Sequence, residues 1–259
     1  MISKATDMPT KVDLNADMGE SFGPWVMGDD TALLDIITSA NVACGFHAGD
    51  PDVMDQTMRR AVAKNVGIGA HPGFADLKGF GRRNLPIPAD ELANAVAYQL
   101  GAAQAMARRA GGRIRHLKLH GALANMASVD VALAKACYQA ALDVDPDLVI
   151  MVLAATEQER AARDLDCHWA GEIFADRAYN DDATLVDRRL PGAVLYDPAA
   201  VGPRILAMLQ ADAIITQSGK HIPCKIDTIC LHGDTPGAVS IARGLRDHLT
   251  TAGITLSPL

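Results

Sequence analysis

Cysteine is scarce in this sequence: there are five residues among 259, and no two of them form a C-x-x-C pair. Zinc ribbons and thiol redox motifs use such pairs, so neither kind of site is indicated. Cys44, Cys137 and Cys230 stand among apolar residues and are expected to be small buried side chains. An odd number of scattered thiols is typical of a reducing compartment. We therefore expect a cytoplasmic location.

Basic runs and long apolar runs are also missing. The net charge is −7, which argues against nucleic-acid binding because that requires a basic surface. Basic residues form only short pairs, such as Arg82-Arg83 and Arg188-Arg189. No stretch is apolar over the ~20 residues that a bilayer crossing needs, and the opening MISKATDMPTK has no signal-peptide core. We expect neither a nucleic-acid nor a membrane partner.

Glycine-rich nucleotide motifs are absent as well. No G-x-G-x-x-G follows the first strand-like segment, so a Rossmann domain is not favoured. Gly219-Lys220 has no glycine five positions earlier and no Ser or Thr after it, so it is not a P-loop. Any nucleotide would have to bind without a Walker motif, or on another subunit.

Short strand-like segments alternate with longer helical patterns along the chain. Helices are expected to begin at Asp50-Pro51, at Pro88, after Ser128 and at Thr235-Pro236, which are N-cap or first-turn signals. The alternation predicts a parallel sheet, and no polar linker divides the chain. We expect one domain, residues 1–259, folded as a closed or nearly closed α/β barrel of about seven strands. The strands are expected at 12–17, 41–46, 67–71, 117–120, 148–153, 172–175 and 226–232. The long charged stretch 176–198 is expected to fold over the site.

The first expected strand carries polar residues at alternate positions. Asp13, Asn15 and Asp17 share one face because side chains alternate across a strand. In a barrel this face points into the lumen, where carboxylates need partners. The pattern indicates a functional site, a satisfied polar core or a surface edge strand. Glu20 follows at the carboxyl end of the strand, where barrel active sites are built.

Four histidines occupy equivalent places in the expected barrel. His47, His71, His120 and His232 each stand at the end of an expected strand, with a glycine one or two residues later. Glycine permits a sharp turn and the close approach of a ligand. One such histidine would more often be structural, but four at one rim favour a site.

The fourth expected strand repeats the polar spacing of the first. His116, Lys118 and His120 face one way. A lysine in the lumen needs an anionic partner or a lowered pKa. The alternative is a purely structural ion pair. The candidate partners are Asp13, Asp17 and Glu172.

Further ionisable groups stand at the ends of the sixth and last expected strands. Glu172 and Asp176 share a face, and Arg177 begins the long loop. Asp234 follows His232 by two residues and is either a helix cap or the group that orients this imidazole.

Taken together, these segments resemble the LamB/YcsF family, which is the family of the 5-oxoprolinase A subunit. They run from near the start of the chain to near its end. The matching segments are DLNADMGESFG (13–23), NVACGFHAGDP (41–51), GAHPGFADLKGFGRR (69–83), KLHGALANMA (118–127), EIFADRAYNDDATLVDRR (172–189) and CLHGDTPGAV (230–239). Leu119, Ala124, Asp182 and Asp187 differ from the residues usual in the family, which leaves the exact lactam open.

The resemblance implies a seven-stranded, TIM-like (β/α) barrel of the deacetylase kind. It also implies one part of a hydrolase that opens 5-oxoproline (pyroglutamate) to glutamate using ATP, together with subunits B and C. Arg82 and Arg177 would hold the substrate carboxylate. The family's catalytic residues would correspond here to Asp13, Asn15, Asp17, Glu20, His47, His71, Lys118, His120, Glu172, Asp176, His232 and Asp234.

Two other functions are consistent with the same residues. Asp13, His47 and His71 form a carboxylate and two-histidine set that could bind a divalent metal ion in a deacylase or amidohydrolase. Alternatively, the chain is a non-catalytic subunit that binds substrate and docks its partners.

Overall fold

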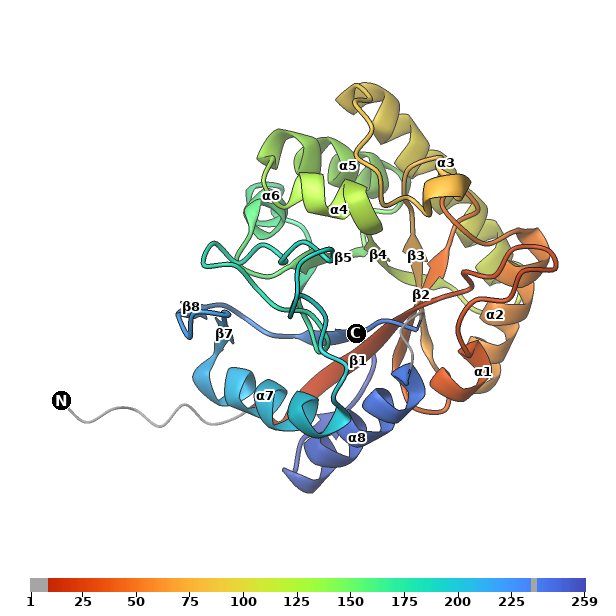
Figure 1. Ribbon diagram of the computed structural model, residues 1–259. Helices are drawn as coiled ribbons and strands as arrows, with labels where there is room; N and C mark the ends of the chain where they lie inside the picture. Colours follow the sequence, from red (N-terminus) through yellow and green to blue (C-terminus); the bar gives the residue numbers. More distant parts are fainter. Residues whose placement is uncertain (1–8, 234–236) are drawn as a thin grey trace.

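The computed structural model describes residues 9–233 and 237–259. Its centre is a closed barrel of parallel strands, in which each strand pairs with the next and the last pairs back with the first (Figure 1). The expectation of a seven-stranded (β/α) barrel is therefore confirmed. The barrel strands are β1 (Lys11–Met18), β2 (Ser39–Ala43), β3 (Gly67–His71), β4 (Ile114–Lys118), β5 (Val149–Leu153), β6 (Trp169–Phe174) and β9 (Thr228–Leu231).

Helices surround the barrel (Figure 1). They are α1 (Asp30–Leu33), α2 (Pro51–Ala63), α3 (Ala89–Arg109), α4 (Gly121–Ala127), α5 (Val131–Val144), α6 (Glu157–Asp164), α7 (Pro198–Ala211) and α8 (Ala238–Thr251), with a 3-10 turn η1 (Leu77–Gly79). Asp50 caps α2 as expected, because its carboxylate accepts from the backbone N–H groups of Asp52 and Val53. The expected helix start at Thr235-Pro236 lies outside the described residues.

One helix start was wrong. Ser128 ends α4, and its hydroxyl donates to the carbonyl of Asn125. The cap of α5 is Asp130, whose carboxylate accepts from the N–H groups of Ala132 and Leu133. Both residue types are good caps, so sequence alone did not separate two candidates that stand two positions apart.

Two small pairings lie outside the barrel. β10 (Thr255–Leu256) pairs in parallel with the start of β1, and β7 (Ala213–Ile215) pairs antiparallel with β8 (His221–Pro223). Neither was expected. Both involve strands of two or three residues, which are too short for an alternation pattern to show.

The two faces of β1 have different environments. Val12, Leu14 and Ala16 are buried in the apolar layer between barrel and helices. The polar residues of the same strand are buried in the barrel interior, where they bond to β2, β6 and β9. The alternation in sequence therefore separates an apolar outer core from a polar lumen. No helix within the described residues is long and apolar enough to cross a membrane.

Candidate active site

Asp13 lies at the floor of the lumen, held by hydroxyl groups. One carboxylate oxygen accepts from Thr38 at 2.6 Å and Ser39 at 2.7 Å, and the other accepts from Thr228 at 2.5 Å. Burial raises the pKa of Asp13, although these hydrogen bonds oppose the shift. The carboxylate is saturated by neighbours that the sequence did not single out. It is not the partner of Lys118, as had been one expectation.

Two amides connect the floor to the middle of the lumen. Asn15 donates to Thr228 at 2.7 Å and to Glu172 at 3.1 Å. Asn41, on β2, donates to Asn15 at 2.7 Å and to Asp17 at 2.9 Å. Sequence reasoning missed Asn41. It begins an expected barrel strand, and its polar side chain on that strand was the signal that could have placed it in the lumen. These amides hold the carboxylates in fixed positions.

His116 completes this network from β4. Its Nε2 lies 2.7 Å from the amide oxygen of Asn41 and donates to it. The ring fills the space beside Gly69, where a Cβ atom would lie 2.0 Å from Nε2. Burial lowers the pKa of His116 to about 3, so it is a neutral hydrogen-bond donor.

Lys118 lies at the centre of the lumen between two carboxylates. Its Nζ is 2.9 Å from Asp17 and 2.9 Å from Glu172, and 3.0 Å from the Cys230 sulfur. Burial alone would lower the Lys118 pKa, but the charge of Asp17, with Cys230 and Glu172, holds it well above its ordinary value. Burial raises the pKa of Glu172, whereas His71 and Lys118 overcome burial and hold that of Asp17 well below its ordinary range. Lys118 is therefore a fixed cation.

Three of the four rim histidines gather with Glu20 into a cluster. The ligand atoms of Glu20, His47, His71 and His120 lie within 4.8 Å of one another, and all four side chains are buried. The His47 and His120 rings stack with centroids 3.6 Å apart, and His71 Nε2 lies 3.0 Å from His120 Nδ1. Three imidazoles and a carboxylate are ligands that suit a metal ion, and the cluster could hold one. Of the expected metal-binding trio, His47 and His71 lie in this cluster, whereas Asp13 lies at the floor of the lumen and Glu20 is the carboxylate beside the two histidines.

The fourth rim histidine forms a separate pair. His232 Nδ1 lies 2.9 Å from both carboxylate oxygens of Asp176. The ring stacks on Phe174 with centroids 5.1 Å apart. Burial would raise the pKa of Asp176, but His232 outweighs it and holds the pKa below its ordinary value. Asp176 therefore accepts from His232 Nδ1 and fixes the orientation of this ring. Asp234, one expected candidate for this role, lies outside the described residues.

A cavity of about 770 Å³ opens above the lumen. Its wall includes Asp17, His71, Lys118, His120, Glu172 and His232. The long segment after β6 supplies much of the remaining lining, from Asn180 to Arg189, as expected of the stretch 176–198. Leu119, Ala124, Asp182 and Asp187 also face this cavity.

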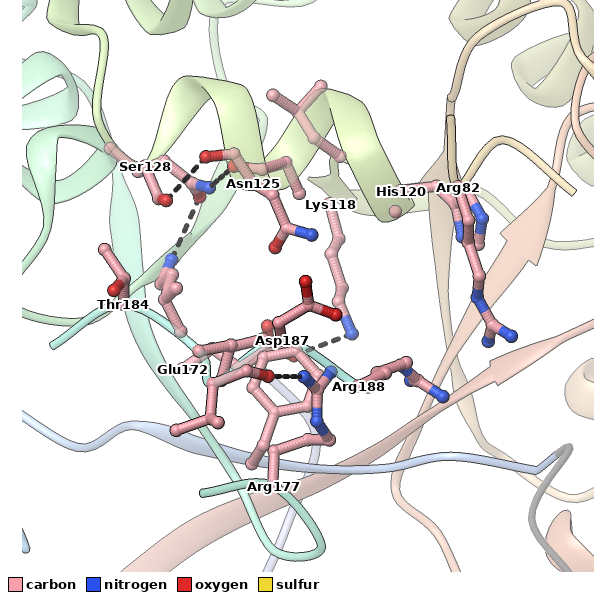
Figure 2. Close-up of a pocket in the computed structure, with 18 of the residues that line it drawn as sticks. Arg82, Lys118, His120, Asn125, Ser128, Glu172, Arg177, Thr184, Asp187 and Arg188 are labelled. Carbon is pink, nitrogen blue, oxygen red and sulfur yellow. Dashed lines mark hydrogen bonds and ion pairs between the residues drawn. The ribbon is translucent and has the colours of Figure 1, made fainter. Parts of the chain in front are cut away.

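Arginines bring positive charge to the same cavity. Figure 2 shows Lys118 and Arg177 extending into it, with Arg82 and Arg188 along one side. Arg177 is buried, and it donates from Nη2 to the Val186 carbonyl at 2.6 Å and from Nε to the Ala193 carbonyl at 3.3 Å. Burial, helped by the charge of Arg188, lowers the Arg177 pKa to about 10. A small anion would relieve this accumulation of cations.

The fold and these groups define a class: a (β/α) barrel with buried ionisable side chains beneath a cationic cavity at the carboxyl ends of its strands. Comparison with known proteins gives the family. The sequence model of the LamB/YcsF family matches residues 12–259, so the chain belongs to that family, as its motifs predicted.

Similar proteins cover nearly the whole chain. The 5-oxoprolinase A subunit of Ruegeria pomeroyi is 68% identical over 248 residues, which are 96% of this chain and 98% of that protein. A protein of the same name from Rhodopseudomonas palustris strain BisA53 is 54% identical, over 96% of this chain and 98% of its own length. The crystal structure of a lactam utilization protein from Thermus thermophilus superposes with a TM-score of 0.90 at 38% identity, covering 96% of this chain and all of the other.

Proposed function

We propose that this protein is the A subunit of an ATP-dependent 5-oxoprolinase, which hydrolyses 5-oxo-L-proline or a related lactam to glutamate. The observation that carries the proposal is the 68% identity, over nearly the full length of both chains, to a protein named as the A subunit of 5-oxoprolinase. The cavity supports it, because a small lactam carboxylate fits a site with several cations over fixed carboxylates. Partner subunits B and C are part of the proposal, as is a cytoplasmic location, which agrees with five free cysteines.

The chemistry explains why ATP is needed. A five-membered lactam is a poor electrophile, and its opening is not strongly downhill. In the proposed reaction the lactam oxygen attacks the γ-phosphorus of ATP, which releases ADP and leaves an O-phosphorylated imidate. Water then adds to the ring carbon, and the ring C–N bond breaks as the nitrogen takes up a proton, which leaves an acyl phosphate. A second water releases phosphate and gives glutamate.

The described side chains fit separate roles in this reaction. Arg177 and Arg82 would hold the substrate carboxylate, since both line the cavity. Lys118 would stabilise negative charge that develops on the lactam oxygen or phosphate. His232, oriented by Asp176, would remove the proton from the attacking water.

ATP would bind either on this chain or on a partner. The sequence has no Walker motif, and within the described residues the arginine-lined cavity is a place where phosphates would meet several cations.

The test is reconstitution with candidate B and C subunits, followed by a panel of lactams with and without ATP. Glutamate and phosphate should appear together, only with ATP and all three subunits. Lys118→Met and His232→Gln should abolish turnover, whereas Lys135→Met and His221→Gln, at positions that do not line the cavity, should not. Turnover that survives Lys118→Met would remove that residue from the mechanism.

A second candidate, a metal-dependent amidohydrolase, is favoured by the buried cluster of Glu20, His47, His71 and His120. It predicts hydrolysis of an amide by this chain alone, without ATP. Release of product without ATP and without partners would favour this candidate over the first.

A further inference from the structure

In the histidine cluster, two ring nitrogens face each other, and the hydrogen bonds of the two rings place no proton between them. His71 Nδ1 lies 2.8 Å from the backbone carbonyl of Lys118, and His120 Nε2 lies 2.8 Å from that of Phe80. A carbonyl oxygen only accepts, so each of these nitrogens carries the proton. A neutral imidazole has one N–H, so if both rings are neutral, His71 Nε2 and His120 Nδ1 both present lone pairs. These two atoms face each other at 3.0 Å.

Negative charge beside this contact increases the demand for a cation. An oxygen of Asp17 lies 3.3 Å from His71 Nε2, and Glu20 Oε1 lies 4.0 Å from His120 Nδ1. Two lone pairs and two carboxylates around one point repel one another unless a positive charge lies among them. The cation is either a proton on one imidazole or a metal ion.

His47 decides between these two. Its side chain is fully buried, and neither ring nitrogen has a hydrogen-bond partner. A proton shared by His71 and His120 would leave both His47 nitrogens buried without a hydrogen-bond partner, which is unfavourable. A metal ion would use it, because His47 Nε2 lies 3.9 Å from Glu20 Oε1 on the same cluster.

The surroundings of the rings are those of a metal site. Metal-binding histidines usually donate their second N–H to a carbonyl or carboxylate, as His71 and His120 do here. Two glycines leave room for the rings: a Cβ at Gly73 would lie 2.8 Å from His47 Nδ1, and one at Gly81 would lie 2.7 Å from His47 Cβ. The side chains are thus fixed closely around one point.

We propose that Glu20, His47, His71 and His120 bind one divalent first-row transition metal ion, of which Zn²⁺ is the type. The ligand atoms are a Glu20 oxygen, His71 Nε2, His120 Nδ1 and one nitrogen of His47. Ligands of a tetrahedral Zn²⁺ stand about 3.3 Å apart, and the observed separations of 3.0, 3.9 and 4.0 Å bracket that value. His71 and His120 line the cavity, so the ion would lie in its wall. The proposal does not depend on which reaction the cavity performs.

The experiment measures metal binding rather than turnover. The full chain is stripped with a chelator, titrated with ZnCl₂ by calorimetry, and analysed for bound metal after gel filtration. One ion per chain is expected. His47→Asn and His71→Asn should each weaken binding by more than about 100-fold, beyond the 10–100-fold typical of an outer partner. His168→Asn and His221→Asn, at exposed histidines outside the cluster, are the matched controls and should bind as the parent does.

A spectroscopic measurement keeps the test decisive if a variant does not fold. Co²⁺ added to the stripped parent chain should give intense visible d–d bands of low coordination number, and one equivalent of Zn²⁺ should remove them. Absence of these bands and of stoichiometric zinc from the folded parent would overturn the proposal in favour of a shared proton. So would undiminished binding by folded His47→Asn.

Discussion

Replacing Lys118 by methionine should destabilise the protein through the carboxylates that it leaves behind. Lys118 lies 2.9 Å from both Asp17 and Glu172, and all three side chains are buried. Methionine fills a similar volume, so little cavity forms. The main cost is two buried carboxylates without their cation, and breaking a buried ion pair in this way costs about 3–5 kcal/mol.

The loss should depend on pH in a defined direction. Burial raises the pKa of Glu172 even with Lys118 present, so without the lysine this carboxyl takes up a proton more readily still. Protonation removes one of the two repelling charges. The deficit of Lys118→Met relative to the parent should therefore be largest at alkaline pH, where Glu172 is ionised, and shrink as the pH falls.

Urea unfolding followed by circular dichroism at several pH values measures this loss. Lys118→Met combined with Glu172→Gln should recover part of the stability, because it removes one stranded charge. Lys135→Met is the control, since the side chains of Lys135 and its partner Asp164 are about 40% exposed and their ion pair should contribute nothing measurable. A loss below about 1 kcal/mol, a loss independent of pH, or a double variant no more stable than the single one would refute the reasoning.

Three further outcomes follow from the same geometry. Gly69→Ala should unfold at markedly lower urea concentration, because its Cβ would overlap His116 Nε2; Gly101→Ala, at a helix position with open space, is the control, and equal midpoints would contradict the assignment. Asp176→Asn should reduce ATP-dependent lactam opening by about 10²–10⁴-fold with little change in lactam affinity, which calorimetry and turnover together would test. Asp176 also has a folded-state pKa below its unfolded value. Its stabilisation is therefore present above about pH 4 and is lost as the pH falls through the folded pKa, so Asp176→Asn should flatten the acid limb of a stability–pH curve.

The sequence predicted the barrel and the inward face of β1 because alternation carries that information. Asp13, Asn15 and Asp17 all point into the lumen, as their spacing indicated. It did not predict their depth. In a closed barrel the strands are staggered, and a residue's height depends on register with its neighbours. That register places Asp13 beside Thr228 at the floor and Asp17 beside Asn41 nearer the cavity.

The rim histidines were predicted as a group, but their division was not. His71 ends β3, whereas His47 stands four residues beyond β2 and reaches the cluster through a loop with Gly45 and Gly49 at positive φ. Loop paths of this kind carry little pattern in a single sequence. The contact between His232 and Asp176 likewise depends on the pairing of β6 with β9. These two strands are neighbours in the barrel but are separated by a long stretch of sequence. The pairing of β6 with β9 brings these residues together.

The ionisable groups of the site and much of its cavity wall come from different parts of the chain. The acid and base groups stand on or just beyond barrel strands, where many hydrogen bonds fix them. Much of the opposite wall, by contrast, is one continuous piece of chain, residues 177–189, in which Arg177 donates to the carbonyls of Val186 and Ala193. Under the proposed function, selection of the lactam would thus be encoded largely apart from the groups that open it. A relative could acquire a new ligand by exchanging this single stretch while its reactive centre stays intact.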